Sequence, residues 1–402
     1  MKKFLMAVLF AALPALMSAQ NNGNSLNMEL GKGLEIAFDG GKYVFNFGGY
    51  LQLGGQYIDT KDAQSETRFD IQRAYVSGGM SMFDGKFSVF TQFDFADSYP
   101  LLDAWVAYRP VKALTITVGQ MQSFSGPLSM RFDDRALALD RSLLDRTFFR
   151  SGRELGIFLE SRLPLRSAGL DLGLAVTSGD GRNSFGSGSS DFDLGGLKYS
   201  ARLTLFPFGF FDNRTDVDFA REQRVKMSIG GTFSYNCGAS DAVGEGHGNM
   251  HLYNQAGEED YPDYQKISAD MMIKYRGFTF LAEYVNATAA GLNGLYYDPT
   301  PTAQLYPRKI AEYLVLGNGF TLQAGYLFRR NWAVDLRYDQ IVPEWKEQQT
   351  LIRKTWSVKG GVSKYFIDNR LKVQLLGSYT DMPDMVAGNK QFLAEISAHI
   401  VF

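Results

Sequence analysis

The chain contains one cysteine, Cys237, and three histidines in 402 residues. With a single cysteine, no disulfide can form within the chain, even in an oxidising compartment. The sequence has no stretch of 18 consecutive apolar residues, so it predicts no membrane-spanning helix. It also has no long basic run, and its formal net charge is −2, so we expect no nucleic-acid partner.

Residues 1–19 have the three-part layout of a secretory signal peptide. Lys2 and Lys3 give a positive start, 4–16 is an apolar run too short to span a membrane, and small residues end the segment before Gln20. We predict that this segment directs export and is removed; an uncleaved interfacial anchor is the alternative. Residues 20–42 are then expected to form a short periplasmic N-terminal segment.

The last residues of the chain alternate in polarity. Every even position from Phe392 to Phe402 is apolar, whereas Glu395, Ser397 and His399 are polar. This period of two predicts a strand with one apolar and one polar face. The alternation recurs in sixteen segments, which are 43–58, 67–82, 86–97, 101–109, 113–121, 153–163, 168–178, 196–207, 225–237, 264–276, 277–287, 319–328, 331–340, 351–366, 370–380 and 391–402.

The apolar faces of these segments carry few charges. Charged residues are 21% of the chain, yet only Asp70 and Lys364 are candidates for an outward charge. A Lys or Arg that faces lipid at mid-bilayer costs about 2–4 kcal/mol, which explains their scarcity if this face meets lipid. In segment 67–82 the apolar parity changes between Ile71 and Val76, which predicts a bulge.

These patterns predict an all-β fold, a transmembrane antiparallel β-barrel of about 16 strands formed by residues 43–402. An even strand number is typical of bacterial outer-membrane barrels. Sixteen strands enclose a bore too wide for wall side chains to fill, which predicts a water-filled lumen. Short turns alternate with the long loops 122–152, 179–195, 238–263 and 288–318; residues 208–224 break this rule, through an extended turn or a shifted register.

Several short stretches follow one another in a recognisable order. They are Gly49-Tyr50-Leu51-Gln52, Gln72-Arg73-Ala74, Val118-Gly119-Gln120-Met121-Gln122-Ser123-Phe124, Asp140-Arg141-Ser142 and Arg153-Glu154-Leu155-Gly156. In this order and spacing, residues 43–160 resemble the family of phosphate-selective porins O and P. The resemblance implies a passive trimeric pore of sixteen strands, whose third outer loop folds inward and narrows the bore.

In that family, arginines and lysines of the bore attract phosphate. Two departures remove basic charge here: Gln72-Arg73 stands where the family often has adjacent arginines, and Gln122 stands where it often has a lysine.

The loop 122–152 carries most of the candidate site residues. A guanidinium offers a fixed fork of donors that suits phosphate or carboxylate. We predict a pore constriction and anion-binding set that comprises Arg73, Arg131, Arg135, Arg141, Arg146, Arg150 and Arg153. Four aspartates share the loop, so each arginine has an alternative role in an ion pair that fastens the loop to the wall; they are Asp133, Asp134, Asp140 and Asp145.

Further bases have the parity of the polar face. The predicted secondary lumen-lining set is Lys198, Arg202, Lys226, Lys274, Arg337 and Lys359. Because inward bases slightly exceed inward acids, we expect a weak to moderate preference for anions.

The sequence gives no catalytic, cofactor or metal site. His247 and His251 lie near Glu245, but no helix orients them as metal ligands. His399 faces the lumen and could pair with a serine as in outer-membrane phospholipases, yet no nearby motif supports nucleophilic chemistry.

The leading interpretation is a non-enzymatic outer-membrane porin, a passive channel for small solutes that prefers phosphate or related anions. The expected partners are outer-membrane lipid, small anions, two further copies in a homotrimer, and the barrel-assembly machinery, which would engage the last strand ending in Phe402. An outer-membrane barrel hydrolase and a non-conducting structural or adhesive barrel are the alternatives. Residues 20–42 are too few for the plug of an energy-coupled transporter.

Overall fold

The computed structural model describes residues 23–402 except 30, 184–195, 247, 249 and 347–348. The predicted signal peptide, residues 1–19, lies outside the described residues, and so does His247. Across the described part of the chain, no helix has both the length and the apolar character needed to cross a membrane.

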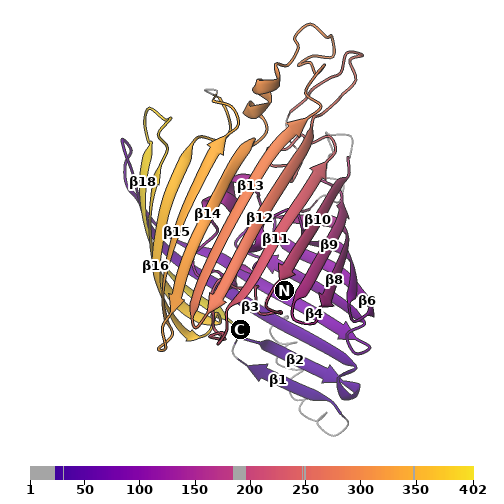
Figure 1. Ribbon diagram of the computed structural model, residues 1–402, viewed down its shortest axis with the longest axis vertical. Coiled ribbons are helices and arrows are strands. Elements are labelled where there is room, and N and C mark those ends of the chain that lie inside the picture. Colours follow the sequence, from indigo (N-terminus) through magenta and orange to yellow (C-terminus); the bar gives the residue numbers. More distant parts are fainter. Residues whose placement is uncertain (1–22, 30, 184–195, 247, 249, 347–348) are drawn as a thin grey trace, which may run out of the picture.

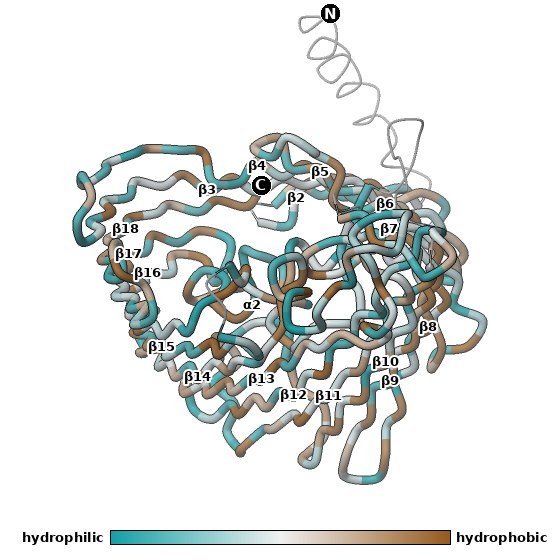
Figure 2. The backbone as a smooth tube through the Cα atoms, turned by 90° about the horizontal axis from the view of Figure 1, so that it is seen from above, coloured by the Kyte–Doolittle hydropathy of each residue, from teal (hydrophilic) through white to brown (hydrophobic). Residues whose placement is uncertain are grey.

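Sixteen antiparallel strands form a closed ring in the described part of the chain. Each strand pairs with the next, and β18 pairs with β3 to close the ring, which Figure 2 shows from above. The strands are β3 (Tyr43–Thr60), β4 (Glu66–Met82), β5 (Phe87–Asp94), β6 (Leu101–Val111), β7 (Leu114–Gln122), β8 (Arg153–Pro164), β9 (Gly169–Thr177), β10 (Lys198–Phe206), β11 (Lys226–Asn236), β12 (Asp263–Tyr275), β13 (Phe278–Ala290), β14 (Gly317–Leu327), β15 (Trp332–Pro343), β16 (Thr355–Ile367), β17 (Leu371–Asp381) and β18 (Lys390–Val401). The predicted sixteen-stranded antiparallel barrel is confirmed, and each predicted segment overlaps one strand.

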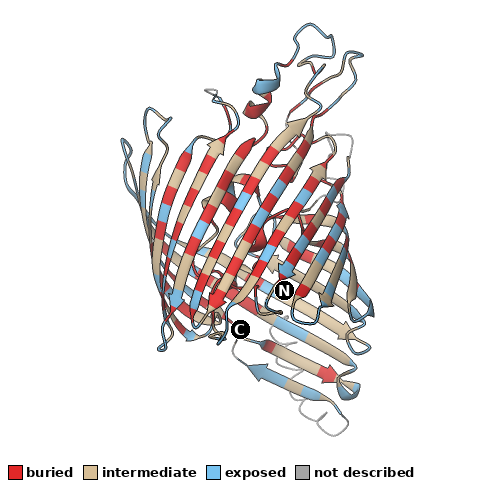
Figure 3. Cartoon of the chain, in the orientation of Figure 1, coloured by how far each residue is buried: buried red, intermediate tan, exposed pale blue. Residues whose placement is uncertain are grey.

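Burial alternates along the strands, as the period-2 pattern requires (Figure 3). In β10, Lys198 and Arg202 point inward and are buried, whereas Leu203 between Arg202 and Thr204 is half exposed. Large apolar side chains remain exposed around the outside of the ring; Leu375 at the middle of β17 is 60% exposed. A continuous apolar outer surface of this kind is stable only against another apolar medium.

The predicted bulge lies at Gln72 in β4. Gln52 of β3 pairs with Arg73, but its neighbour Leu53 pairs with Ile71, so Gln72 is the extra residue. Because the bulge reverses the parity of the residues before it, Phe69 and Ile71 face outward and Asp70 between them faces inward. The expected outward charge at Asp70 is therefore wrong.

The other predicted outward charge, Lys364, does lie on the outer face. It sits near the end of β16, where its Nζ donates a hydrogen bond to the carbonyl oxygen of Arg330 at 2.6 Å and lies 5.4 Å from the ring centre of Trp332. A lysine at a strand end can reach the interface, where its cost is small.

A hairpin precedes the barrel. Its strands β1 (Ser25–Glu29) and β2 (Gly33–Phe38) pair with each other, and β2 pairs with the first residues of β3. The hairpin continues the sheet past the end of β18, close to the C-terminus (Figure 1), and Glu29 forms an ion pair with Arg370 at 3.2 Å. These two strands were not predicted, because five or six residues give too little alternation to be recognised. The 3₁₀ turn η1 (Asp39–Gly41) leads from β2 into β3.

The two ends of the barrel differ. Long loops lie at one end, where a loop containing η4 (Pro307–Glu312) projects beyond the ring (Figure 1). The opposite, short-turn end has tight connections such as Phe83-Asp84-Gly85 between β4 and β5, whose three residues all have positive φ. Residues 207–225 between β10 and β11 are the exception, and both flanking strands keep their register, so this turn is extended.

Residues 123–152 between β7 and β8, here named the constriction loop, fold into the barrel (Figure 2). The loop contains η2 (Leu128–Arg131), η3 (Asp134–Ala136) and α2 (Leu143–Phe148). Ser142 caps α2, because its Oγ accepts a hydrogen bond from the backbone N–H of Asp145 at 2.9 Å. Apolar loop side chains such as Leu144 and Phe148 are fully buried, which holds the loop inside the ring.

Candidate pore constriction

Asp134 of η3 is where the constriction loop meets the wall at β4. Its carboxylate lies 3.1 Å from Nε of Arg73 on the wall and 3.0 Å from Nε of Arg141 in the loop, and it accepts a hydrogen bond from the hydroxyl of Tyr75. Arg141 also donates to the carbonyl oxygen of Phe132 at 2.8 Å. Burial raises the pKa of Asp134, but the charges of Arg73 and Arg141 outweigh it and hold this pKa well below its usual range.

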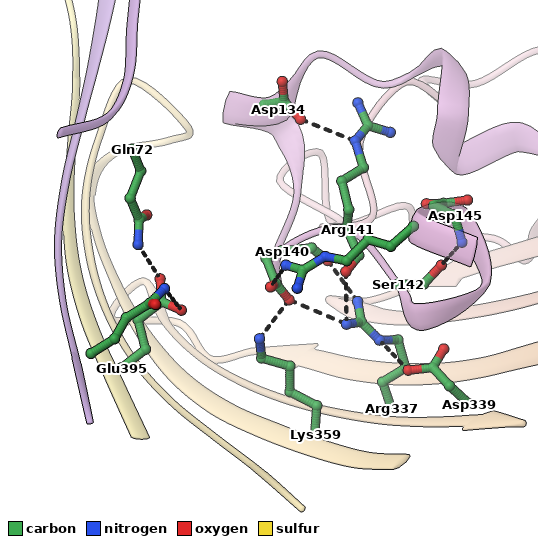
Figure 4. A network of polar contacts seen from close by, with 12 residues as sticks. Gln72, Asp134, Asp140, Arg141, Ser142, Asp145, Arg337, Asp339, Lys359 and Glu395 are labelled. Atoms are coloured by element: carbon green, nitrogen blue, oxygen red, sulfur yellow. Dashed lines mark hydrogen bonds and ion pairs between the residues drawn. The ribbon is translucent and has the colours of Figure 1, made fainter. Parts of the chain in front are cut away.

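Asp140 joins the constriction loop to the opposite wall. Its Oδ1 lies 2.6 Å from Nζ of Lys359 on β16 and 3.2 Å from Nη2 of Arg337 on β15, and Arg146 pairs with Oδ2 (Figure 4). Arg337 in turn bonds Asp339 at 3.1 Å. Burial raises the pKa of Asp140, but these three positive charges lower it well below its usual range.

A third attachment joins α2 to β13. The hydroxyl of Ser129 lies 2.9 Å from the carboxylate of Asp145 and 2.7 Å from that of Glu283, and the backbone N–H of Ser129 donates to Glu283 at 2.7 Å. One hydroxyl proton serves only one of the two carboxylates, so a proton on the other carboxyl group completes the chain of hydrogen bonds. Burial raises the pKa of Asp145 above its usual range.

A cavity of about 1080 Å³ lies between the constriction loop and the wall of β4–β8, and extends toward the long-loop end. Six arginines and six acidic side chains line it, so its charge is balanced. They are Arg73, Arg141, Arg146, Arg150, Arg153 and Arg182 with Asp94, Asp97, Asp134, Asp145, Asp180 and Glu245. Arg146 and Arg150 are the most accessible, with side chains 58% and 57% exposed.

A second cavity, of about 560 Å³, lies on the short-turn side of the same loop. Its charge is unbalanced, because six bases face three acids: Arg109, Lys112, Arg131, Arg162, Arg202 and Arg214 against Glu160, Asp171 and Asp212. In the described part of the chain, Arg109, Lys112 and Arg214 form no ion pair. A further cavity of about 380 Å³, also lined by Asp133 and Arg135, lies beside it toward β3.

The cavities on the two sides of the loop are separated by a row of paired charges. Asp134 with Arg73 makes one pair across the gap, and Asp103 of β6 with Arg153 of β8, 3.0 Å apart, makes the next. Tyr75 lines the cavities on both sides of this row. We name these residues, with Arg141, the partition. The described cavities therefore narrow to a few side chains at this level.

The structure places the predicted constriction arginines in three groups. Arg73, Arg141 and Arg153 belong to the partition, Arg146 and Arg150 line the large cavity, and Arg131 and Arg135 face the cavities of the short-turn side. Each of these arginines has an acidic partner. The pairs are Arg73–Asp134, Arg141–Asp134, Arg153–Asp103, Arg146–Asp140, Arg150–Asp241, Arg131–Glu160 and Arg135–Asp133. The set is thus distributed over three cavities around the constriction loop, and its anion-binding role stays a prediction.

The predicted secondary set lies mostly underneath the inward-folded segments. Lys198 and Arg202 are buried in ion pairs with Glu154 and Asp270, and Lys274 donates to two backbone carbonyls. Arg337 and Lys359 bind Asp140 as described, and Nζ of Lys226 donates to the carbonyl oxygen of Phe208 at 2.9 Å. Their charges are directed at protein acceptors, and contact with a solute stays a prediction.

Two participants were not predicted from the sequence. Tyr75 has the inward parity of Arg73, so the residues after the bulge would have indicated it. Arg182 forms an ion pair with Asp97 at 2.6 Å between two separate loops, and no local pattern signals such a contact.

Of the three histidines, His399 and His251 lie in the described part of the chain, and His399 lies beside a serine. Nε2 of His399 lies 2.9 Å from the hydroxyl of Ser397, and its Nδ1 lies 2.6 Å from that of Tyr50. This serine–histidine pair is buried beside a space of about 10 Å³, too small for a substrate. Glu245, which is near His247 and His251 in the sequence, accepts a hydrogen bond from the backbone N–H of Gly152 at 2.9 Å. In the described residues no cluster of three metal-ligating side chains occurs.

Comparisons with known proteins extend the fold assignment. Neither a protein-family profile nor a curated protein sequence matches the chain. Among solved structures it is similar to OprB of Pseudomonas putida (TM-score 0.55, 10% identity, 90% of this chain and 94% of that chain) and to the outer membrane channel DcaP of Acinetobacter baumannii (TM-score 0.54, 11% identity, 91% and 99%). It is also similar to OmpF of Salmonella typhi, solved in complex with daunomycin (TM-score 0.53, 12% identity, 90% of this chain and 98% of that chain). At these identities the likeness shows a shared barrel fold, and the resemblance to phosphate-selective porins stays a prediction.

Proposed function

We propose that the chain is an outer-membrane porin, a passive channel for small solutes. The observation that carries this proposal is the set of cavities on the two sides of the constriction loop, inside a closed barrel whose outer face is apolar. Fixed charges in such a bore set which ions enter it. The similar solved structures support the proposal, since one of them is described as an outer membrane channel.

The channel prefers anions. Its large cavity is balanced in charge, but the short-turn cavity carries an excess of bases, and Arg109, Lys112 and Arg214 there have no acidic partner among the described residues. A positive potential in a narrow bore concentrates anions from solution. Phosphate and related anions are the proposed permeants, because exposed guanidinium groups such as those of Arg146 and Arg150 suit their oxygens.

The proposed setting follows from the same features. The signal-like residues 1–19 direct export, the short-turn end faces the periplasm, and the channel works as a homotrimer inserted through its C-terminal strand by the barrel-assembly machinery. Short periplasmic turns and longer outer loops are the usual orientation of bacterial barrels.

Reversal potentials across a salt gradient in a planar lipid bilayer test the ion preference. We expect the sign of an anion-selective channel, reduced by the triple variant Arg109→Gln, Lys112→Gln, Arg214→Gln. Added phosphate should block the chloride current, and Arg146→Ala with Arg150→Ala should weaken the block. A cation-selective sign in the wild type contradicts the anion preference, whereas an unchanged block in the arginine variants contradicts the assignment of those residues.

A further inference from the structure

The extended turn 207–225 enters the barrel from the short-turn end. Its central residues Thr215, Asp216, Val217 and Asp218 are 6%, 2%, 4% and 1% exposed. Connecting segments normally run over the surface, because buried backbone groups need partners. A deeply buried turn in a wide barrel therefore needs a physical reason, which its contacts supply.

The wall holds the turn in place. Nζ of Lys274 on β12 donates to the carbonyl oxygens of Asp212 and Val217 at 2.8 and 3.0 Å. The carboxylate of Asp218 accepts a hydrogen bond from the backbone N–H of Gly277 at 2.7 Å, at the connection from β12 to β13. A charged donor shared by two carbonyls and a charged acceptor on a backbone N–H are strong contacts when buried, so the turn is a fixed support.

The same turn also holds the constriction loop. Oδ1 of Asp216 accepts a hydrogen bond from the backbone N–H of Ala138 at 2.7 Å, and the hydroxyl of Thr215 donates to the carbonyl oxygen of Ala136 at 2.9 Å. Val217 packs with Ala138 in one buried apolar cluster. Oδ2 of Asp216 accepts from Nε2 of Gln323 on β14 at 2.7 Å. One carboxylate therefore bridges the barrel wall and the loop.

The supported segment is the one that carries the partition. Ala136 ends η3, and η3 begins at Asp134, whose carboxylate meets Arg73 across the gap. Ala136 and Asp134 are only two residues apart in one short helix, so a movement of the Ala136 backbone also moves the Asp134 carboxylate. A shift of Ala136 away from the turn changes the distance between Asp134 and the wall.

We propose that Asp216 and Thr215 are positioning residues, and that the turn 207–225 sets the width of the partition from the periplasmic side. The inference deepens the proposed function and rests on it, because a partition width has meaning only for a conducting bore. Two inward-folded segments, one from each end, then fix the narrow part of the channel together.

Single-channel recording of Asp216→Ala tests this inference. The variant leaves the N–H of Ala138 without its acceptor, so the loop spends more time away from the wall. We expect transitions to a state of larger unitary conductance. The fraction of time spent in this state should increase on the order of tenfold, which corresponds to the loss of about 1.4 kcal/mol of stabilisation of the closed loop position. Asp216→Asn keeps an acceptor oxygen for the N–H of Ala138. Its new amide N–H can donate to the side-chain oxygen of Gln323 once the Gln323 amide rotates, so this variant should behave as the wild type does.

Two controls make the outcome decisive. Gln223→Ala alters an exposed side chain of the same turn, which among the described residues bonds only the carbonyl oxygen of Arg221, and this variant should conduct as the wild type does. Thr215→Val removes the hydroxyl that bonds Ala136. It replaces Asp216→Ala as the test variant if Asp216→Ala does not show the circular dichroism spectrum of a folded barrel. A conducting wild type with unchanged conductance in the folded alanine or valine variant overturns the inference alone, whereas a silent wild type overturns the proposed function.

Discussion

Single side chains decide how narrow the bore is. Arg73 and Arg141 share the carboxylate of Asp134, so the partition is held together by ion pairs and has three arginines against two aspartates. An arginine buried in such a pair braces the loop, whereas Arg146, which pairs with Asp140, has a side chain 58% exposed, so part of its guanidinium group is accessible to a solute. The anion-binding role therefore stays a prediction, and it concerns the accessible arginines first.

Asp134→Ala should enlarge the unitary conductance and increase anion selectivity. Removal of one partner from a buried ion pair costs about 3–5 kcal/mol and leaves Arg73 and Arg141 without their shared carboxylate. The measurement is single-channel conductance together with the reversal potential. Asp133→Asn is the matched control, because it removes a neighbouring charge while the amide oxygen can still cap η3. Equal conductance in both variants would show that Asp134 does not lie at the narrow point.

The stability that Asp140 contributes should depend on pH in one direction. Its pKa is lowered in the folded protein, so the contribution is complete above the ordinary aspartate pKa of about 3.9 and is lost as the pH falls through the lowered value. The difference in thermal unfolding temperature between wild type and Asp140→Asn in detergent should be constant from neutral pH down to that ordinary value, then shrink. A difference that grows with acidification contradicts the ion-pair account.

At the scale of elements, strand alternation was predictable and long-range contact was not. The period-2 pattern is local, so all sixteen strands and the bulge beside Gln72 could be predicted from neighbouring residues. The positions of the constriction loop and of the turn 207–225 depend on partners far away in the chain, such as Gln323 for Asp216. The outward direction predicted for Asp70 was wrong because the sequence indicates that a bulge exists but not at which residue. The position of the bulge decides which of the preceding side chains face inward.

The lipid-facing assignment of the strands predicts a depth-dependent cost of charge. Leu375→Arg places a charge in the middle of β17, where exposure to the bilayer midplane costs about 2–4 kcal/mol, whereas Val111→Arg at the end of β6 costs about 0–1 kcal/mol. Unfolding in lipid vesicles by denaturant measures both. Equal free energies of unfolding for the two variants would contradict the depth assigned to β17.

For the whole molecule, the lumen is divided rather than uniformly open. The constriction loop, the loop between β11 and β12 and the turn 207–225 fill the side next to β10–β17, and bury lysines such as Lys266 and Lys372 there. The cavities lie on the other side, toward β3–β9. Strand count alone predicts a wide bore. The bore of this barrel is narrower because these three segments fold inward, two from the long-loop end and one from the short-turn end.

The central claim is that this barrel encloses a continuous hydrated path, and single-channel recording of the purified protein in a planar lipid bilayer tests it most directly. The account predicts discrete, long-lived unitary steps whose size rises with salt concentration. Folded, inserted protein that gives no such steps at any applied voltage would contradict it.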